Sequence, residues 1–90
     1  MKVVYKVVVN NSAVEHKFSM EFDGENTPKI VSLEKALPLF QLWAVAAMNC
    51  KYDLTGQEIM TLDDLEAAAV TGRKWYYVRD WLVDLYVTFE

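Results

Sequence analysis

Residues that mark common chemistries are scarce in this 90-residue sequence, which has one cysteine, one histidine and three glycines. A single cysteine cannot build a disulfide framework within the chain. The cysteine and histidine spacings of zinc sites are absent as well. Because Gly24, Gly56 and Gly72 lie far apart, the sequence has no glycine-rich loop to hold a phosphate. The sequence therefore predicts no metal and no cofactor.

Basic residues are in the minority. Nine lysines and arginines stand against thirteen aspartates and glutamates, which gives a net charge of −4. Proteins that bind duplex DNA normally present a basic face, so direct nucleic-acid binding is not expected. Hydrophobic residues make up 53% of the chain, as in globular proteins and unlike disordered ones. We expect a single domain over residues 1–90, large enough to bury a core without disulfides or metal.

Long apolar runs are missing too. The first twenty residues alternate valine with charged residues and lack the continuous apolar stretch of a signal peptide. The most apolar run, residues 37–50, has fourteen residues and includes Pro38, Gln41 and Asn49. A run of this length is too short to cross a bilayer and is typical of a buried helix. With Cys50 interpreted as a reduced, buried thiol, these features predict a cytoplasmic protein that does not interact with a membrane.

The first quarter of the sequence predicts a β-hairpin. Residues 2–9 are rich in β-branched side chains, and the NNSA sequence at 10–13 is typical of a turn. Residues 14–22 then alternate between apolar and polar side chains, with His16 on the apolar side. A period of two over nine residues indicates a half-buried strand.

An apolar helix is expected after a loop over residues 23–28. Ser32 is the candidate N-cap of this helix, and apolar residues follow at helical spacing from Leu33 to Met48. Pro38 removes one backbone donor and crowds the preceding turn. We therefore expect either a kink at Pro38 or a helix that begins there.

A second, shorter helix is expected over about residues 62–70. Thr61 precedes it, and Asp64 follows Thr61 at the spacing of a capping box. Gly72 is suited to end the helix, because glycine readily adopts the left-handed conformation found there. The preceding residues, 51–60, are expected to form a connection.

The C-terminal segment, residues 72–90, contains six of the twelve aromatic residues in the chain. Its composition favours a strand whose odd-numbered side chains face the helices. Seventeen strand residues would extend roughly 55 Å, beyond the size of a compact domain of this length. A bulge or bend is therefore predicted near Arg79–Asp80, with a helix over 74–84 as the alternative. The overall prediction is an α+β two-layer domain of order ββααβ, in which two helices cover a three-stranded antiparallel sheet.

One stretch of the sequence carries charge of a single sign. No basic residue occurs between Lys51 and Arg73, whereas five acidic residues do: Asp53, Glu58, Asp63, Asp64 and Glu66. They lack the alternating oxygen pattern of a calcium loop. They form either a solvated loop and helix face, or an acidic patch that steers the protein toward a partner with a basic surface, such as a nucleic-acid-binding protein.

The second candidate surface lies on the C-terminal strand. A two-layer domain leaves one face of its sheet open to solvent, and Val4 and Val8 are expected there. The even-numbered residues of the last strand are expected to share that face: Tyr76, Val78, Leu82 and Tyr86. Because tyrosine is enriched in binding surfaces, this face either meets an identical or foreign partner chain, or is covered more fully by helices or a loop than assumed.

These features favour a small binding protein that regulates or inhibits a partner macromolecule, as small phage-encoded or accessory regulators do. No enzymatic activity is expected, because the sequence does not group a nucleophile, a base and an orienting residue. The alternative is a homo-oligomer joined through the outer face or the edge of the sheet. A third hypothesis is a small enzyme whose site is completed at a dimer interface, with His16, Cys50, Tyr52 and Asp53 as its candidates.

Overall fold

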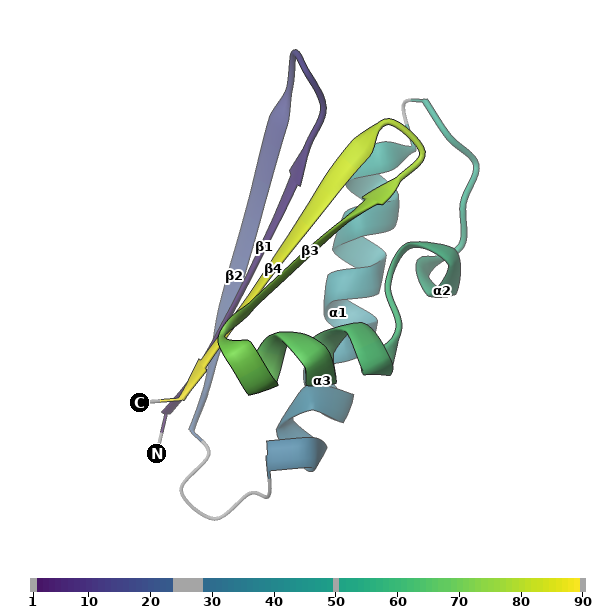
Figure 1. Cartoon of the computed structure of the whole chain (residues 1–90). Helices are drawn as coiled ribbons and strands as arrows, with labels where there is room; N and C mark the ends of the chain where they lie inside the picture. Colours follow the sequence, from purple (N-terminus) through teal and green to yellow (C-terminus); the bar gives the residue numbers. More distant parts are fainter. Residues whose placement is uncertain (1, 24–28, 50, 90) are drawn as a thin grey trace.

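The computed structural model describes residues 2–23, 29–49 and 51–89. Within these residues the chain forms four strands and three helices in the order β1β2α1α2α3β3β4 (Figure 1). The strands are β1 (Lys2–Asn10), β2 (Glu15–Asp23), β3 (Arg73–Val78) and β4 (Trp81–Phe89). The helices are α1 (Lys29–Met48), α2 (Gly56–Ile59) and α3 (Leu62–Thr71).

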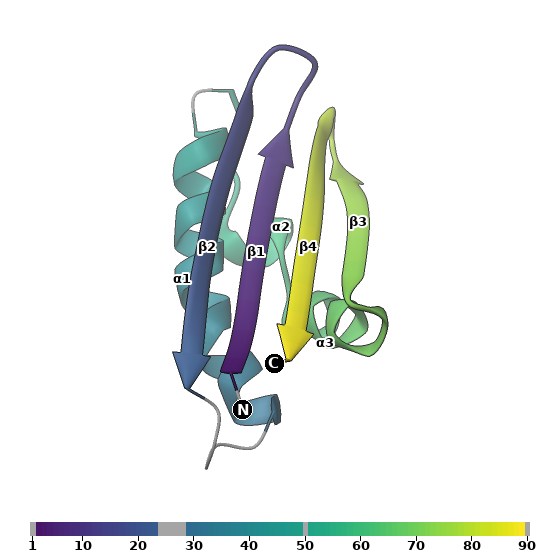
Figure 2. The same ribbon diagram turned by 90° about the vertical axis from the view of Figure 1, so that its left-hand side faces the viewer.

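The four strands form one sheet in the order β2-β1-β4-β3, and each neighbouring pair is antiparallel. Helix α1 packs against β1 and β2, and α3 packs against β3 and β4. Figure 2 shows all three helices behind one face of the sheet, with no described segment in front of the other face. The α+β prediction and the N-terminal hairpin are therefore confirmed. The prediction of three strands is wrong.

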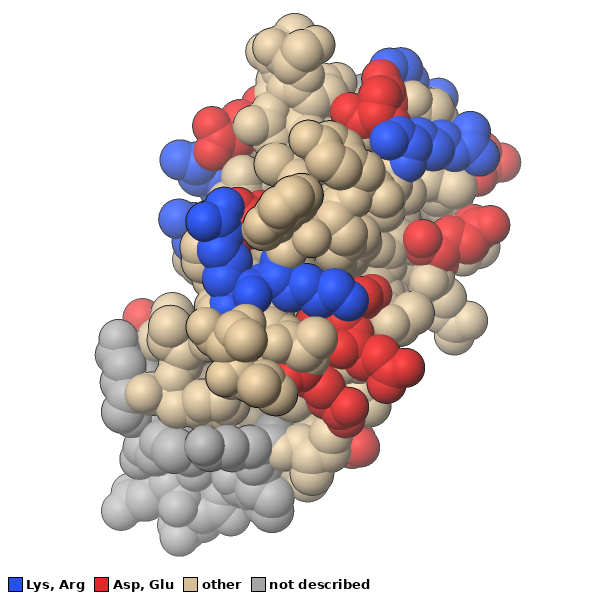
Figure 3. Space-filling view, in the orientation of Figure 1, with Lys and Arg blue, Asp and Glu red and all other residues tan. Residues whose placement is uncertain are grey.

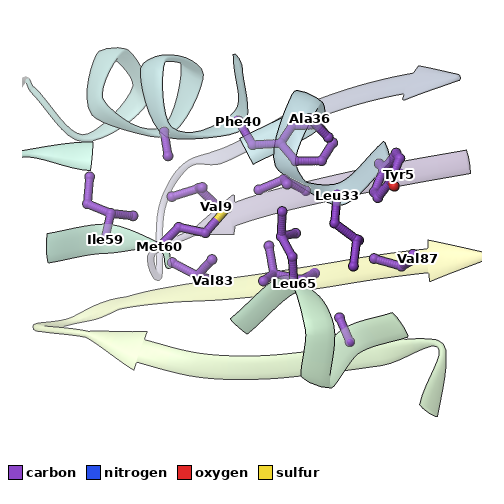
Figure 4. Packing of buried hydrophobic residues seen from close by; sticks show 14 of the residues in the cluster. Tyr5, Val9, Leu33, Ala36, Phe40, Ile59, Met60, Leu65, Val83 and Val87 are labelled. Atoms are coloured by element: carbon purple, nitrogen blue, oxygen red, sulfur yellow. The ribbon is translucent and has the colours of Figure 1, made fainter. Parts of the chain in front are cut away.

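The core lies between the sheet and the helices. The strands contribute alternate residues, as a period of two requires, and α1 contributes residues three or four apart. Figure 4 shows side chains from both layers meeting in this space, where Phe40 of α1 lies close to β1. The buried residues are Val3, Tyr5, Val7 and Val9 of β1, Trp81, Val83, Leu85 and Val87 of β4, and Leu33, Ala36, Phe40, Ala44 and Met48 of α1, together with Ile59, Met60, Leu65 and Ala68.

The C-terminal segment is a tight hairpin and not one strand. Strand β3 ends at Val78, β4 begins at Trp81, and these two residues pair directly. Arg79 and Asp80 form the turn between them, with Arg79 at φ 57°. The predicted bend is therefore in the right place but reverses the chain completely, and the alternative helix over 74–84 is wrong. The reversal fits both strands into a molecule whose longest dimension is 40 Å.

Helix α1 begins earlier than the sequence predicts. It starts at Lys29, so Ser32 is a buried residue within the helix and not its N-cap. Pro38 lies inside the helix on its exposed side, so the helix does not begin there. The loop predicted before α1 falls mostly on residues 24–28, which lie outside the described residues.

The prediction for α3 is confirmed at both ends. The Thr61 hydroxyl accepts a hydrogen bond from the Asp64 backbone N–H, and the Thr61 N–H donates to the Asp64 carboxylate. Gly72 ends the helix at φ 88°. The short helix α2 was not predicted, although Thr55 and Glu58 form the same capping box at its start.

Candidate functional site

The two-residue turn determines which side chains of β3 face solvent. Because Val78 lies opposite Trp81, even-numbered residues of β3 share the helix-covered face with odd-numbered residues of β4. Tyr76 therefore packs inward, and its hydroxyl donates to the Ile59 carbonyl oxygen at 2.7 Å. The expectation that Tyr76 and Val78 lie on the open face is wrong. It assumed that residues 73–89 form one strand, in which side chains alternate between the two faces without interruption at Arg79–Asp80.

The open face instead carries Trp75 and Tyr77, which are 59% and 65% exposed. Their rings contact each other edge to face, with 6.4 Å between centroids. Leu82, directly opposite Tyr77, and Tyr86, opposite Arg73, also lie on this face and are half-buried. Trp75 and Tyr77, named here the aromatic pair, were missed because no sequence signal revealed the hairpin.

A buried carboxylate lies beside the aromatic pair on the open face. Asp84, opposite Trp75, is only 7% exposed. Arg73 donates to both of its carboxylate oxygens through Nε and Nη2, each at 2.9 Å, and the Tyr86 hydroxyl donates to Oδ2 at 2.7 Å. These bonds to Asp84 raise the pKa of Arg73 and the pKa of Tyr86. Charge-assisted, two-pronged pairing holds Arg73 in one geometry across the face.

The Tyr86 ring is bordered by two cations on the same face. The Arg73 guanidinium lies 5.1 Å and the Lys6 ammonium 5.2 Å from its centroid, distances typical of cation–π contacts. The open face near β3 is therefore an ordered set of rings and cations. We name it the sheet-face site, and its members are Lys6, Arg73, Trp75, Tyr77, Leu82, Asp84 and Tyr86.

Two of the five acidic residues have structural roles. Glu58 accepts a hydrogen bond from the Thr55 backbone N–H, which lowers the pKa of its carboxyl group. Burial alone would raise the pKa of Asp64, but hydrogen bonds from Lys74 at 2.7 Å and from Thr61 outweigh it, so the pKa is lowered. These two carboxylates stabilise helix ends and the contact between α3 and β3.

The remaining acidic residues are more accessible. Asp53 lies exposed in the connection before α2, and α3 presents Asp63, which is exposed, and Glu66, which is partly exposed. Figure 3 shows carboxylates gathered over α3 beside lysine or arginine side chains. Helix α3, which carries Asp63 and Glu66, packs against β3 on the covered face of the sheet, opposite to the aromatic pair.

We expect the protein to lose stability as the pH falls below about 4, the ordinary range for carboxyl groups. A carboxyl group whose pKa is lowered by folding stabilises the protein above its unfolded pKa. That contribution is lost as the pH falls through the folded value. For Asp64 the loss is expected to be about 1 kcal/mol, the usual value of a helix cap. Urea denaturation between pH 7 and acid conditions would measure it.

The Asp64→Asn variant tests the assignment. Its free energy of unfolding should depend less on pH than that of the wild type, because the amide that replaces the carboxyl group has no proton to gain. Asp63→Asn is the matched control, since Asp63 is the exposed neighbour on the same helix turn, and it should keep the wild-type pH dependence. An equal flattening in both variants would contradict the role given to Asp64.

Two of the residues proposed for an enzymatic site, His16 and Tyr52, have separate partners. His16 stacks on Trp81 with 6.1 Å between ring centroids, and the Tyr52 hydroxyl donates to Asp80, which also pairs with Lys51. Cys50 lies outside the described residues. Among the residues that are described, no three His, Cys, Asp or Glu side chains are grouped as metal ligands.

A shallow hollow of about 330 Å³ lies where the two hairpin turns meet the open face. The polar residues Asn10, Asn11, Ser12 and Asp80 line part of it, and Tyr77 and Leu82 line the rest. The Asn11 side chain is bound to the backbone N–H groups of Ala13 and Val14. The hollow therefore extends the sheet-face site toward the turns.

Helix α1 presents a second apolar surface. Residues 36–49 contain no charged side chain, and Leu39 and Leu42 are 47% and 69% exposed. The segment Ile30–Met48 is long and apolar enough to cross a membrane. The core helix of a soluble protein can meet the same two criteria of length and composition. The opposite side of α1 packs in the core through Phe40 and Met48.

Comparisons with known proteins give no match. No family model, no curated protein and no solved structure is similar to the chain. The sheet-face site and the acidic residues of α3 are therefore interpreted from their geometry alone.

Proposed function

We propose that the protein docks onto a partner macromolecule through the sheet-face site and thereby regulates or inhibits that partner. The observation that carries the proposal is the uncovered sheet face with Trp75 and Tyr77 exposed at its edge. A tryptophan and a tyrosine side by side on an open surface are the residue types that contribute most to binding at interfaces.

The surroundings of the aromatic pair favour binding because they are already ordered. Asp84 fixes Arg73 through two hydrogen bonds, and Tyr86 is held by the same carboxylate. Side chains that are immobile before binding lose little conformational entropy on association. Strands β3 and β4 also form a rigid support, which holds a binding constellation more accurately than a loop does.

The acidic residues indicate the chemistry of the partner. The chain has a net charge of −4, and α3, which packs against β3 on the covered face, presents Asp63 and Glu66 to solvent. A negative surface of this kind accelerates association with a basic surface. A nucleic-acid-binding protein has such a surface, and it is the class of partner that we propose.

Reversing the charge on α3 is expected to slow association. The partner is first identified by affinity capture and mass spectrometry, then purified. In the Asp63→Lys/Glu66→Lys variant the association rate constant should fall by roughly tenfold at low ionic strength, because steering toward a basic surface is lost. Surface plasmon resonance at increasing salt would measure the rate, and the difference from wild type should shrink as salt screens the charges.

The Glu15→Lys/Glu34→Lys variant is the control. It changes the net charge by the same amount, but it does so at exposed positions on β2, the opposite edge of the sheet, and on α1. Its association rate should fall much less than that of the α3 variant. Equal effects of the two variants would show that only net charge matters and would exclude a localised role for α3.

A further inference from the structure

The two edges of the sheet differ in how they discourage pairing with another strand. On the open face, edge strand β2 carries Glu15, Lys17 and Glu21, with an ion pair of 3.3 Å between Lys17 and Glu15. Charged side chains of this kind protect sheet edges from pairing with other strands. Edge strand β3 has four consecutive uncharged residues, 75–78, three of them aromatic. Strand β3 is therefore the unprotected edge.

The charged residues of β3 are already neutralised within the chain. Arg73 pairs with Asp84 at 2.9 Å, and Lys74 pairs with Asp64 at 2.7 Å. They therefore repel an incoming strand less than an unpaired charge would.

The hydrogen-bonding pattern shows which backbone groups of β3 point away from the sheet. The Val87 N–H donates to the Gly72 carbonyl at 3.1 Å, so these opposed residues form a hydrogen-bonded pair. Such pairs alternate along an antiparallel ladder, so the even-numbered residues of β3 use their N–H and C=O groups on β4. The backbone groups of Arg73, Trp75 and Tyr77 point to the open edge. Consistently, the Arg73 carbonyl accepts from the Thr71 hydroxyl at 2.8 Å.

We propose that this edge pairs with β3 of a second copy of the chain. The two strands run antiparallel about a twofold axis at Trp75 and join two four-stranded sheets into one. In this register Trp75 pairs with its own symmetry mate, and Arg73 pairs with Tyr77 of the other copy. Each outward-pointing residue then exchanges two backbone hydrogen bonds, about six in all.

The number of backbone hydrogen bonds favours this register over its neighbours. With the axis at Trp75 all three outward-pointing residues are paired, whereas an axis at Lys74 or at Tyr76 pairs only two of them within β3. With a twofold axis beyond Tyr76, the paired segments would include the turn residues 79–80.

Amide hydrogen exchange and light scattering test the proposal on the wild-type chain. At high protein concentration we expect the mass of a dimer and slow exchange at the amides of Trp75 and Tyr77. On dilution both amides should exchange rapidly, while those of Tyr76 and Val78 stay protected by β4. A monomer at about 100 µM, or a dimer in which the Trp75 and Tyr77 amides remain unprotected, would overturn the proposal.

Two variants separate backbone pairing from side-chain contact. Trp75→Pro removes an outward N–H and leaves the bonds to β4, so the dimer should dissociate on the order of tenfold more readily or worse. Trp75→Thr keeps the N–H and should dimerise more tightly than the proline variant. A Leu42→Lys variant on α1 should leave the dimer unchanged, and loss of the dimer there would overturn the proposal. Neither result decides whether a monomer docks onto a foreign partner, because that proposal is tested by partner binding and not by dimerisation.

Discussion

Replacing Trp75 and Tyr77 together by serine is expected to weaken binding of the partner by about 100-fold or more. Central aromatic residues of interfaces often contribute about 2 kcal/mol or more each on truncation, and about 2.7 kcal/mol corresponds to a 100-fold change in affinity. Stability should change far less, because both rings are mostly exposed in the folded chain. Isothermal titration calorimetry with the partner would measure the affinity, and thermal unfolding would measure the stability.

The exposed leucines of α1 provide the matched control. Leu39→Ser/Leu42→Ser removes two apolar side chains of similar exposure from the other apolar surface. Binding by this variant should remain within a few-fold of wild type. If instead the α1 variant loses binding and the β3 variant keeps it, the docking surface is the outward side of α1 and the proposed site is wrong.

The elements that could be predicted from the sequence are those with a local signal. Strand β2 alternates apolar and polar residues over nine positions, and the structure has the strand at Glu15–Asp23. Helix α3 is bracketed by Thr61 and Asp64 at its start and by Gly72 at its end. In each case the chemistry that stabilises the element, alternate burial or capping, involves residues close together in the sequence.

The β3–β4 hairpin could not be predicted because its turn has no usual signal. Two-residue turns favour glycine or asparagine, which adopt positive φ easily, whereas this turn consists of Arg79 and Asp80. Arg79 adopts φ 57° although such values are unfavourable for a side chain with a Cβ. If the alternation of a strand is shifted by one residue, every side chain of that strand moves to the other face of the sheet. Because the turn was not predicted, Tyr76 and Val78 were assigned to the wrong face of the sheet.

The start of α1 was missed for a different reason. The helix is apolar on both its buried and its exposed sides, so its sequence gives little indication of which residues face the sheet or where the pattern begins. Ser32 has the chemistry of an N-cap, but the helix continues before it to Lys29. Burial of Phe40 and Leu33 against the sheet, which depends on distant strands, determines the phase of this helix.

Replacing Phe40 by alanine is expected to lower the free energy of unfolding by about 3–5 kcal/mol, the usual range for a buried aromatic residue. Phe40 is fully buried, and its ring contacts Tyr5 of β1 and Phe18 of β2 edge to face, at 5.7 and 5.6 Å between centroids. Removing the ring therefore leaves a cavity between α1 and two strands. Domains are commonly stable by only about 5–15 kcal/mol, so a large part of the total stability would be lost.

The adjacent residue provides the control for this prediction. Leu39 lies on the exposed side of α1, and Leu39→Ala should change the free energy of unfolding by less than about 1 kcal/mol. Urea denaturation of both variants, followed by circular dichroism, gives the two values under the same conditions. Similar losses at both positions would mean that both sides of α1 are buried in solution. Self-association through Leu39 and Leu42 would produce that result, and it would place the second copy on α1 and not on β3.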